Sequence, residues 1–165
     1  MANLASEGQY VTFSLANECF AVPVEVVREI LDHEDPSRIP NGPDYLLGLR
    51  DVRGQGVPVL DLRLRLGMTA TEKTPHTRVI VIDVELGGRT LTLGLLADRV
   101  FEVTTFRSDA IEGAPDIGVH WPSDYISGVV RRENGFVVIV NLANLFTPKD
   151  ARSLGSVAAP LMESA

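Results

Sequence analysis

The sequence contains a single cysteine, Cys19, and this scarcity limits the chemistry that the protein can carry. One thiol excludes an intramolecular disulfide framework and a zinc site built from several thiolates. No apolar run approaches the roughly 20 residues that a membrane-spanning helix needs. The opening segment MANLASEGQ has neither the basic start nor the apolar stretch of a signal peptide. These absences predict a globular protein of a reducing compartment.

Basic residues are fewer than acidic ones, so the 165 residues carry a net charge of −7. A nucleic acid or an anionic membrane surface would repel such a chain at long range. We therefore expect no nucleic-acid partner and no direct insertion into a membrane. The hydrophobic share of 45% and the charged share of 22% are ordinary for a folded domain.

The side chains that usually carry catalysis are few and scattered. His33, His76 and His120 lie far apart in loop-like stretches, and the acidic run around His33 is more typical of a solvated loop than of a metal site. The chain has no glycine-rich phosphate loop and no serine on a strand-to-helix elbow. Cys19 stands beside Phe20 in a strand pattern, where a small core residue is expected. The sequence therefore predicts no enzymatic activity, no cofactor and no metal site.

Short alternating apolar segments separated by turn residues predict an all-β protein. Paired strands are expected within residues 9–22, 49–62, 78–100 and 126–140. The second of these hairpins should turn at Gly54-Gln55-Gly56. Residues 23–31 are assigned to a short helix or helical turn, although their β-branched content also permits a strand. The polar stretch 68–77 is the clearest linker.

Two internal matches indicate a duplication. Residues 48–66 match residues 128–146 at a constant shift, and residues 10–30 match residues 79–103. Any two β-hairpins look alike, but two matches in the same order favour two similar small barrels that pack together. Their expected boundaries are 9–67 plus a C-terminal segment for the first barrel, 78–141 for the second, 68–77 for the linker and 148–165 for a tail.

Charged residues gather just before the second hairpin turn. Asp51 and Arg53 should share one face of a strand, with Arg50 on the other face. Two interpretations stay open. An arginine beside a glycine turn is well placed for a bidentate contact with a partner's carboxylate. Alternatively, the charges protect a solvated edge strand against aggregation.

Four segments together resemble the CheW-type chemotaxis coupling proteins: QYVTFSLANECFAVPVEVVREI, SRIPNGPDYLLGLRDVRGQGVPVLDLRLRLG, VIVIDVELGGRTLTLGLLADRVFEV and YISGVVRRENGFVVIVNLANLF. They cover residues 9–147 in the order expected for the family, and RIPNxPxYLxGLxxVRGxxVPVLDLRxRLG is the most specific pattern. The resemblance implies a CheW-like domain at 9–147. It also implies two five-stranded SH3-like barrels around a shared core, with short helices and a C-terminal tail or helix.

The resemblance further implies a cytoplasmic, non-catalytic adaptor without a cofactor, which is recruited to membrane-associated receptor arrays. Such a protein bridges the cytoplasmic tip of methyl-accepting chemoreceptors to the regulatory domain of the chemotaxis histidine kinase. The receptor-binding residues implied by the resemblance are Val27, Glu29, Asp51, Arg53 and Gly54. The kinase-binding residues that it implies are Arg38, Ile39, Glu112 and Ile117.

One position departs from the family pattern, because Asp51 stands where an asparagine is usual. A carboxylate on the same strand face as Arg53 could pair with it and weaken the receptor contact. Two other functions stay open as alternatives. One is a small-ligand-binding β-barrel that uses Trp121 and Tyr125 around a pocket. The other is a regulatory module homologous to the kinase's own CheW-like domain.

Overall fold

The computed structural model of the chain describes residues 6–40, 42–69, 72–86, 88–113, 125–133, 135–146, 150 and 154. Three residues named from the sequence, Ile117, His120 and Trp121, lie outside the described residues. Most of the expected tail at 148–165 lies outside them as well.

Strands dominate the described part of the chain, which confirms the all-β class. Their bounds are β1 Gly8–Leu15, β2 Glu18–Pro23, β3 Val27–Asp32, β4 Leu46–Val52, β5 Gln55–Leu60, β6 Arg78–Leu86, β7 Arg89–Ala97, β8 Arg99–Phe106, β9 Ile111–Glu112, β10 Ile126–Arg132 and β11 Gly135–Val140. The helices are short: η1 Val24–Val26, α1 Leu62–Arg65, η2 Ser108–Ala110 and η5 Leu142–Asn144. Among the described residues, no helix is long and apolar enough to cross a membrane.

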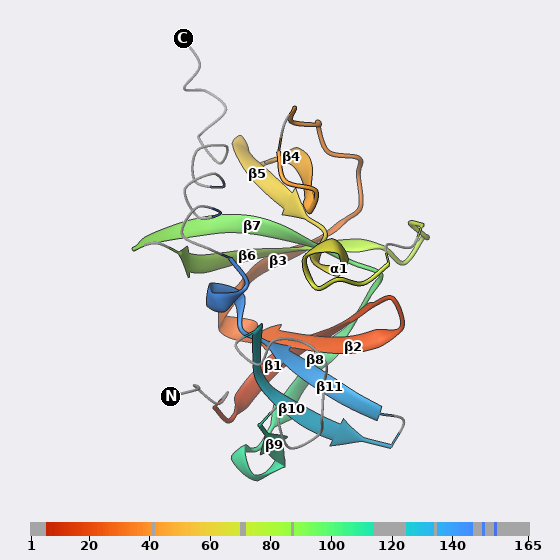
Figure 1. Cartoon of the computed structure of the whole chain (residues 1–165), viewed down its shortest axis with the longest axis vertical. Coiled ribbons are helices and arrows are strands. Elements are labelled where there is room, and N and C mark those ends of the chain that lie inside the picture. Colours follow the sequence, from red (N-terminus) through yellow and green to blue (C-terminus); the bar gives the residue numbers. More distant parts are fainter. Residues whose placement is uncertain are drawn as a thin grey trace.

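The strands form two curled, mixed sheets, which occupy the lower and upper halves of Figure 1. The first sheet has the order β8-β1-β2-β11-β10-β9, and the second has the order β3-β6-β7-β5-β4. The pairs β2–β11 and β5–β7 are parallel, whereas hairpin neighbours are antiparallel. Five main strands in each sheet fit the expected pair of five-stranded SH3-like barrels, and the two-residue β9 adds a short edge to the first sheet.

The internal repeat is visible in the strand pairing. Hairpin β4–β5 lies in the second sheet, and its counterpart β10–β11 lies in the first. Both hairpins carry a register irregularity at the same relative place, between Leu46 and Gly48 in one and between Ile126 and Gly128 in the other. Each hairpin also joins its sheet through a parallel contact of its second strand. The two matched segments are therefore equivalent hairpins in separate sheets.

The sheets do not follow the expected barrel boundaries, which were 9–67 plus a C-terminal segment for the first barrel and 78–141 for the second. Hairpin β1–β2 lies in the first sheet between β8 and β11, which both come from the second half of the chain. Hairpin β6–β7 lies in the second sheet between β3 and β5, which come from the first half. Each half thus gives its first hairpin to one sheet and its later strands to the other. The sequence pattern reveals local hairpins, whereas this exchange depends on long-range pairing.

Residues 23–31 do not form the expected helical turn, apart from η1. Strand β3 begins at Val27 and pairs antiparallel with β6. Exposure alternates along β3, with Val27, Glu29 and Leu31 half-buried and the residues between them exposed. This is the two-residue period of a strand. The β-branched residues disfavour a longer helix. Pairing with β6, which is distant in the sequence, stabilises the strand instead.

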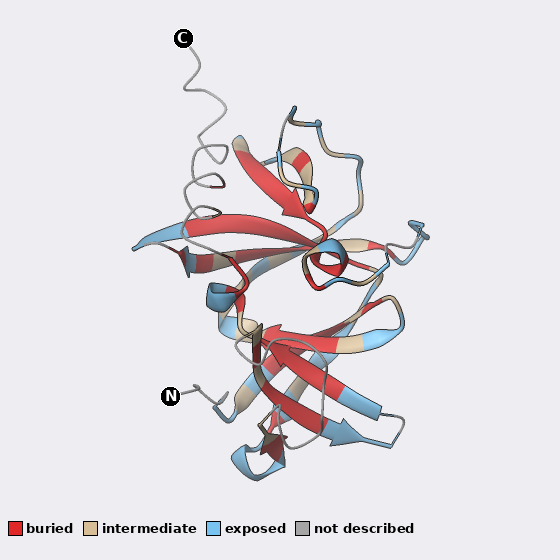
Figure 2. Cartoon of the chain, in the orientation of Figure 1, coloured by how far each residue is buried: buried red, intermediate tan, exposed pale blue. Residues whose placement is uncertain are grey.

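The largest hydrophobic cluster joins side chains of both sheets, and the strands facing it are buried along most of their length (Figure 2). It includes Phe13 and Phe20 from the first sheet, and Ile80, Ile82 and Leu95 from the second. Burial of each such side chain contributes about 1.5–3 kcal/mol relative to leaving it exposed. This shared core holds the two sheets in a fixed relation to each other.

Helix α1 adds a buried ionic contact to the apolar core. Asp61 caps the helix by accepting the backbone N–H of Arg63 at 3.0 Å, and it also holds the Arg63 guanidinium with Nε 2.8 Å from Oδ1. Arg63 donates to Asp98 at 2.8 Å, and Asp98 accepts the backbone N–H of Ala16 at 2.6 Å. Because Ala16 lies between β1 and β2, this chain of contacts connects α1 to the first sheet.

Candidate functional site

The turn between β4 and β5 consists of Arg53 and Gly54. Both have left-handed backbone angles, with φ values of 56° and 83°. A two-residue turn with two positive φ values matches the twist of antiparallel strands. Glycine adopts such an angle without steric cost, whereas arginine rarely does. Asp51 stabilises the turn, because its Oδ1 accepts the backbone N–H of Gly54 at 2.8 Å.

This geometry corrects two expectations about the turn. The turn lies at Arg53-Gly54 and not at Gly54-Gln55-Gly56, since Gln55 already begins β5. Arg53 is therefore a turn residue and does not share a strand face with Asp51. The Asp51 carboxylate is held by the turn backbone, and Arg53 pairs with a carboxylate from another strand, that of Glu29.

Glu29 and Arg53 form a bidentate ion pair, with Nε 3.1 Å from Oε2 and Nη2 3.2 Å from Oε1. Glu29 belongs to β3 and Arg53 follows β4, and these are the two edge strands of the second sheet. The hydrogen bond from Arg53 lowers the pKa of Glu29, and the same hydrogen bond raises the pKa of Arg53. The Arg53 side chain is 78% exposed, so its guanidinium stays accessible to a partner.

The residues expected to bind a receptor gather on these two edges. Val27 is half-buried and packs against the main core. It does not share a face of β3 with Glu29, because the register shifts between them, with Val27 opposite Ile82 and Glu29 opposite Val81 of β6. Asp51 and Gly54 belong to the turn that presents Arg53. The structure brings Glu29 and Arg53 into contact, with Val27 two positions along the strand. The exposed part of this surface is therefore the turn and the ion pair between Glu29 and Arg53.

The first group expected to bind a kinase lies in the loop after β3. Arg38 is exposed and Ile39 is half-buried. Ser37, just before them, pairs with Leu49 of β4 through two backbone hydrogen bonds of 2.8 and 2.7 Å. The loop is thereby attached to the strand that leads into the Arg53 turn.

Arg50 makes a contact that its sequence surroundings do not predict. Its guanidinium donates through Nη1 to the backbone carbonyl of Asp32 at 2.5 Å and through Nη2 to Glu34 at 3.0 Å. These acceptors are 18 and 16 residues away along the chain, so local spacing carries no signal for the contact. Arg50 therefore ties β4 to the end of β3 and to the loop that follows.

The second group expected to bind a kinase is in a different place. Glu112 is half-buried in β9, at the edge of the first sheet. Its carboxylate accepts Nε of Arg131 at 2.6 Å, and the Arg131 guanidinium lies over the ring of Phe136 at 5.5 Å. Ile117 falls outside the described residues. The structure thus places Glu112 on the first sheet, whereas Arg38 and Ile39 belong to a loop of the second.

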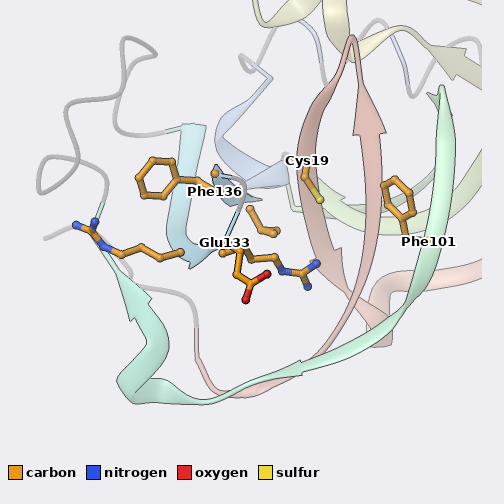
Figure 3. A pocket seen from close by; sticks show the side chains of 8 residues that line it. Cys19, Phe101, Glu133 and Phe136 are labelled. Atoms are coloured by element: carbon orange, nitrogen blue, oxygen red, sulfur yellow. The ribbon is translucent and has the colours of Figure 1, made fainter.

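An open cleft of about 740 Å³ lies on the first sheet, with Cys19, Phe101 and Phe136 in its lining (Figure 3). Burial raises the pKa of the Cys19 thiol. Of the aromatic pair expected around a ligand pocket, Tyr125 is not among the described residues that line this cleft. Tyr125 packs against the main core, and Trp121 falls outside the described residues.

The described surfaces offer contacts for binding and no arrangement for metal chemistry. Among the described residues, no group of three or more His, Cys, Asp or Glu side chains is placed to hold a metal ion. The candidate sites consist of a tight turn, ion pairs and half-buried apolar side chains. Such a mixture of apolar and charged groups is typical of protein–protein interfaces.

Comparisons with known proteins relate the chain to one family. The CheW-like domain family matches residues 9–149. Chemotaxis protein CheW of Bacillus subtilis is 30% identical over 151 residues, which covers 91% of this chain and 93% of the relative. Chemotaxis protein CheW of Klebsiella aerogenes is 27% identical over 150 residues, with 91% and 88% covered. The crystal structure of scaffolding protein TtCheW from Thermoanaerobacter tengcongensis is 27% identical, with a TM-score of 0.75, and the match covers 87% of this chain and 97% of that one.

Proposed function

This chain belongs to the CheW-like family, and we propose that it is a non-catalytic coupling protein that links chemoreceptors to a chemotaxis-type histidine kinase. One partner is the cytoplasmic tip of a methyl-accepting receptor, and the other is the regulatory domain of the kinase. In this role the chain is cytoplasmic and reaches the receptor array through its partners. Coupling of this kind requires separate protein-binding surfaces on one rigid body.

The observation that carries the proposal is the exposed ion pair between Glu29 and Arg53. Arg53 uses Nε and Nη2 for Glu29, and a guanidinium has five N–H donors. Its other donors are left for a carboxylate or carbonyl oxygen of a receptor tip. Because Glu29 already fixes the orientation of the fork, little side-chain freedom is lost on binding.

Kinase binding is proposed at two places that correspond in the internal repeat. Arg38 and Ile39 follow β3, whereas Glu112 and Ile117 follow β8. Strand β3, from the first half of the chain, pairs with β6 of the second half, and β8, from the second half, pairs with β1 of the first half. Two equivalent contacts allow one chain to touch two kinase regulatory domains, as a ring of alternating kinase and coupling protein requires.

A titration with separate partner fragments tests the proposal. The full chain is titrated with a cognate receptor-tip fragment, with the kinase regulatory domain, and with both together. We expect each fragment to bind alone and the three proteins to form one complex. A chain that binds neither fragment contradicts the proposed function.

A pair of matched variants tests the kinase surface. Ile39→Asp would bury an unpaired charge in the contact, and we expect it to abolish kinase binding while receptor binding persists. Val103→Asp, at an exposed position on β8, is the control and should bind both fragments. A folded Ile39→Asp variant that still binds the kinase would show that another surface is used.

A further inference from the structure

Side chains join the two edge strands of the second sheet, β3 and β4, at two places along their length. At one place Arg53 pairs with Glu29 of β3. At the other place Arg50 of β4 reaches the carbonyl of Asp32 and the carboxylate of Glu34. The Arg50 side chain is only 12% exposed, so its orientation is restricted. We call the contact of Arg50 with Asp32 and Glu34 the clasp.

Backbone contacts hold the same loop against the same strand. Ser37 and Leu49 exchange two hydrogen bonds, of 2.8 and 2.7 Å. The approach is so close that a Cβ on Gly48 would lie 2.2 Å from the carbonyl oxygen of Ser37. The loop is therefore attached to β4 at two successive residues, Leu49 by its backbone and Arg50 by its side chain. This attachment comes just before Arg38 and Ile39.

We propose that Arg50 is a positioning residue that couples the receptor-binding turn to the kinase-binding loop. The inference rests on the proposed function of both surfaces. Arg50 and Arg53 stand three positions apart at the end of β4, and their acceptors Glu29 and Asp32 stand three positions apart on β3. The two arginines thus bridge the same two strands, one at each proposed surface. A receptor contact with the remaining donors of Arg53 shifts β4 relative to β3, and Arg50 carries this shift to the loop.

The chemistry of the clasp requires an arginine. Its planar fork reaches a backbone carbonyl and a carboxylate together, whereas lysine offers a single compact charge. Without Arg50, the backbone pairing of Ser37 with Leu49 is the remaining attachment to β4 of the loop that carries Arg38 and Ile39, so this loop becomes less restricted. A less restricted loop loses more conformational freedom on binding, which weakens the kinase contact although Arg50 itself does not touch the kinase.

The experiment measures the affinity of the kinase regulatory domain for the full chain, with and without a saturating receptor-tip fragment. The ratio of the two affinities is the coupling factor, and such factors are typically about 5–150-fold. We expect Arg50→Gln, Arg50→Lys and Glu34→Gln to bring the coupling factor close to one. They should also weaken kinase binding in the absence of receptor by about tenfold.

Matched controls come from the hairpin between β6 and β7. Arg89→Gln and Glu85→Gln make the same chemical changes at exposed positions of that hairpin and should leave the coupling factor at its wild-type value. Melting temperatures are measured for every variant. Because the Glu34 side chain is 75% exposed, Glu34→Gln tests the clasp even where Arg50→Gln does not fold.

The outcomes separate this inference from the function on which it rests. If the wild-type chain binds neither fragment, the proposed function fails. If the wild type binds both fragments but shows no coupling, the inference is overturned and the function stands. The inference is also overturned if folded Glu34→Gln and Arg50→Lys keep the wild-type coupling factor. A coupling factor near one in these variants, with the control variants unchanged, supports it.

Discussion

Arg63 and Asp98 form a charge-assisted hydrogen bond at the junction of the two sheets, with Nη1 2.8 Å from Oδ1. Arg63 lies in α1, which follows the second sheet's strand β5, and Asp98 lies where the chain passes from β7 to β8. Asp61 holds the other side of the same guanidinium, with Nη2 2.9 Å from Oδ2. The Arg63 side chain is 4% exposed, and these two carboxylates compensate its buried charge.

Replacing Arg63 by methionine should destabilise the fold strongly. The substitution keeps an apolar stem but leaves Asp61 and Asp98 without their cation, and breaking a buried pair in this way costs about 3–5 kcal/mol. Urea unfolding measures the loss, with Arg89→Met at an exposed position as the control. If Arg63→Met unfolds at the same urea concentration as that control, the guanidinium does not brace the junction.

The hairpins were predictable from the sequence because their signals are local. Alternating residues and glycine turns identify β4–β5 and β10–β11, and the constant shift between them correctly separates them into two sheets. The exchange of β3 and β8 was not predictable in this way. Val27 pairs with Ile82, and Val11 pairs with Val103. Short-range sequence patterns do not predict partners that are so far apart in the chain.

The binding surface was predictable in part for the same reason. Arg53 stands out beside a glycine turn, but the nearest acid in the sequence, Asp51, is not its partner. The actual partner, Glu29, is 24 residues away and is brought close by the curl of the second sheet. The positive φ of Arg53 was also not predictable, because the neighbouring Gly54 and Gly56 can adopt turn conformations at lower steric cost.

Gly48 should tolerate substitution less well than another glycine with a positive φ. Its φ is +149°, and an added Cβ would lie 2.2 Å from the carbonyl oxygen of Ser37. Gly88 has a φ of +79° but open space around it. Gly88→Ala therefore carries only the backbone cost of about 1–2 kcal/mol, and Gly48→Ala should exceed it clearly. Equal urea midpoints for the two variants would contradict the close approach of loop and strand.

Glu29 should titrate below the ordinary pKa of a glutamate. The hydrogen bond from Arg53 favours the ionised carboxylate and lowers its pKa from the usual 4.5. The stabilising effect of this pair is thus fully present above pH 4.5 and is lost as the pH falls through the lowered pKa. Carboxyl NMR titration should show the pKa rising in Arg53→Ala. An unchanged value would mean that the pair does not persist in solution.

Asp51 should act through the turn and not through Arg53. Asp51→Asn keeps an oxygen that can accept the Gly54 N–H, so receptor affinity and melting temperature should stay near wild type. Asp51→Ala removes the acceptor and should weaken receptor binding by loosening the turn. Calorimetric titration of both variants checks this. Tighter receptor binding by Asp51→Asn would instead indicate that the carboxylate competes for Arg53.

A substitution at Arg53 can separate binding from folding. The φ of 56° is unfavourable for arginine, and Asn-Gly is a preferred pair for a two-residue turn of this type. We therefore expect Arg53→Asn to melt at or above the wild-type temperature, although it lacks the exposed pair with Glu29. A marked fall in the melting temperature would assign Arg53 a bracing role.

The same variant should lose the receptor. Arg53→Asn and Arg53→Ala both remove the guanidinium, and we expect receptor affinity to fall at least about tenfold in each. Arg53→Lys should fail almost as badly, because the charge remains while the planar fork is gone. Affinity for the isolated kinase domain should stay near wild type in all three, since that contact lies on the loop after β3. Titration with the receptor-tip fragment at two salt concentrations measures these differences. If Arg53→Asn binds the receptor as tightly as the wild type, the ion pair with Glu29 is a structural feature and the receptor contact lies elsewhere.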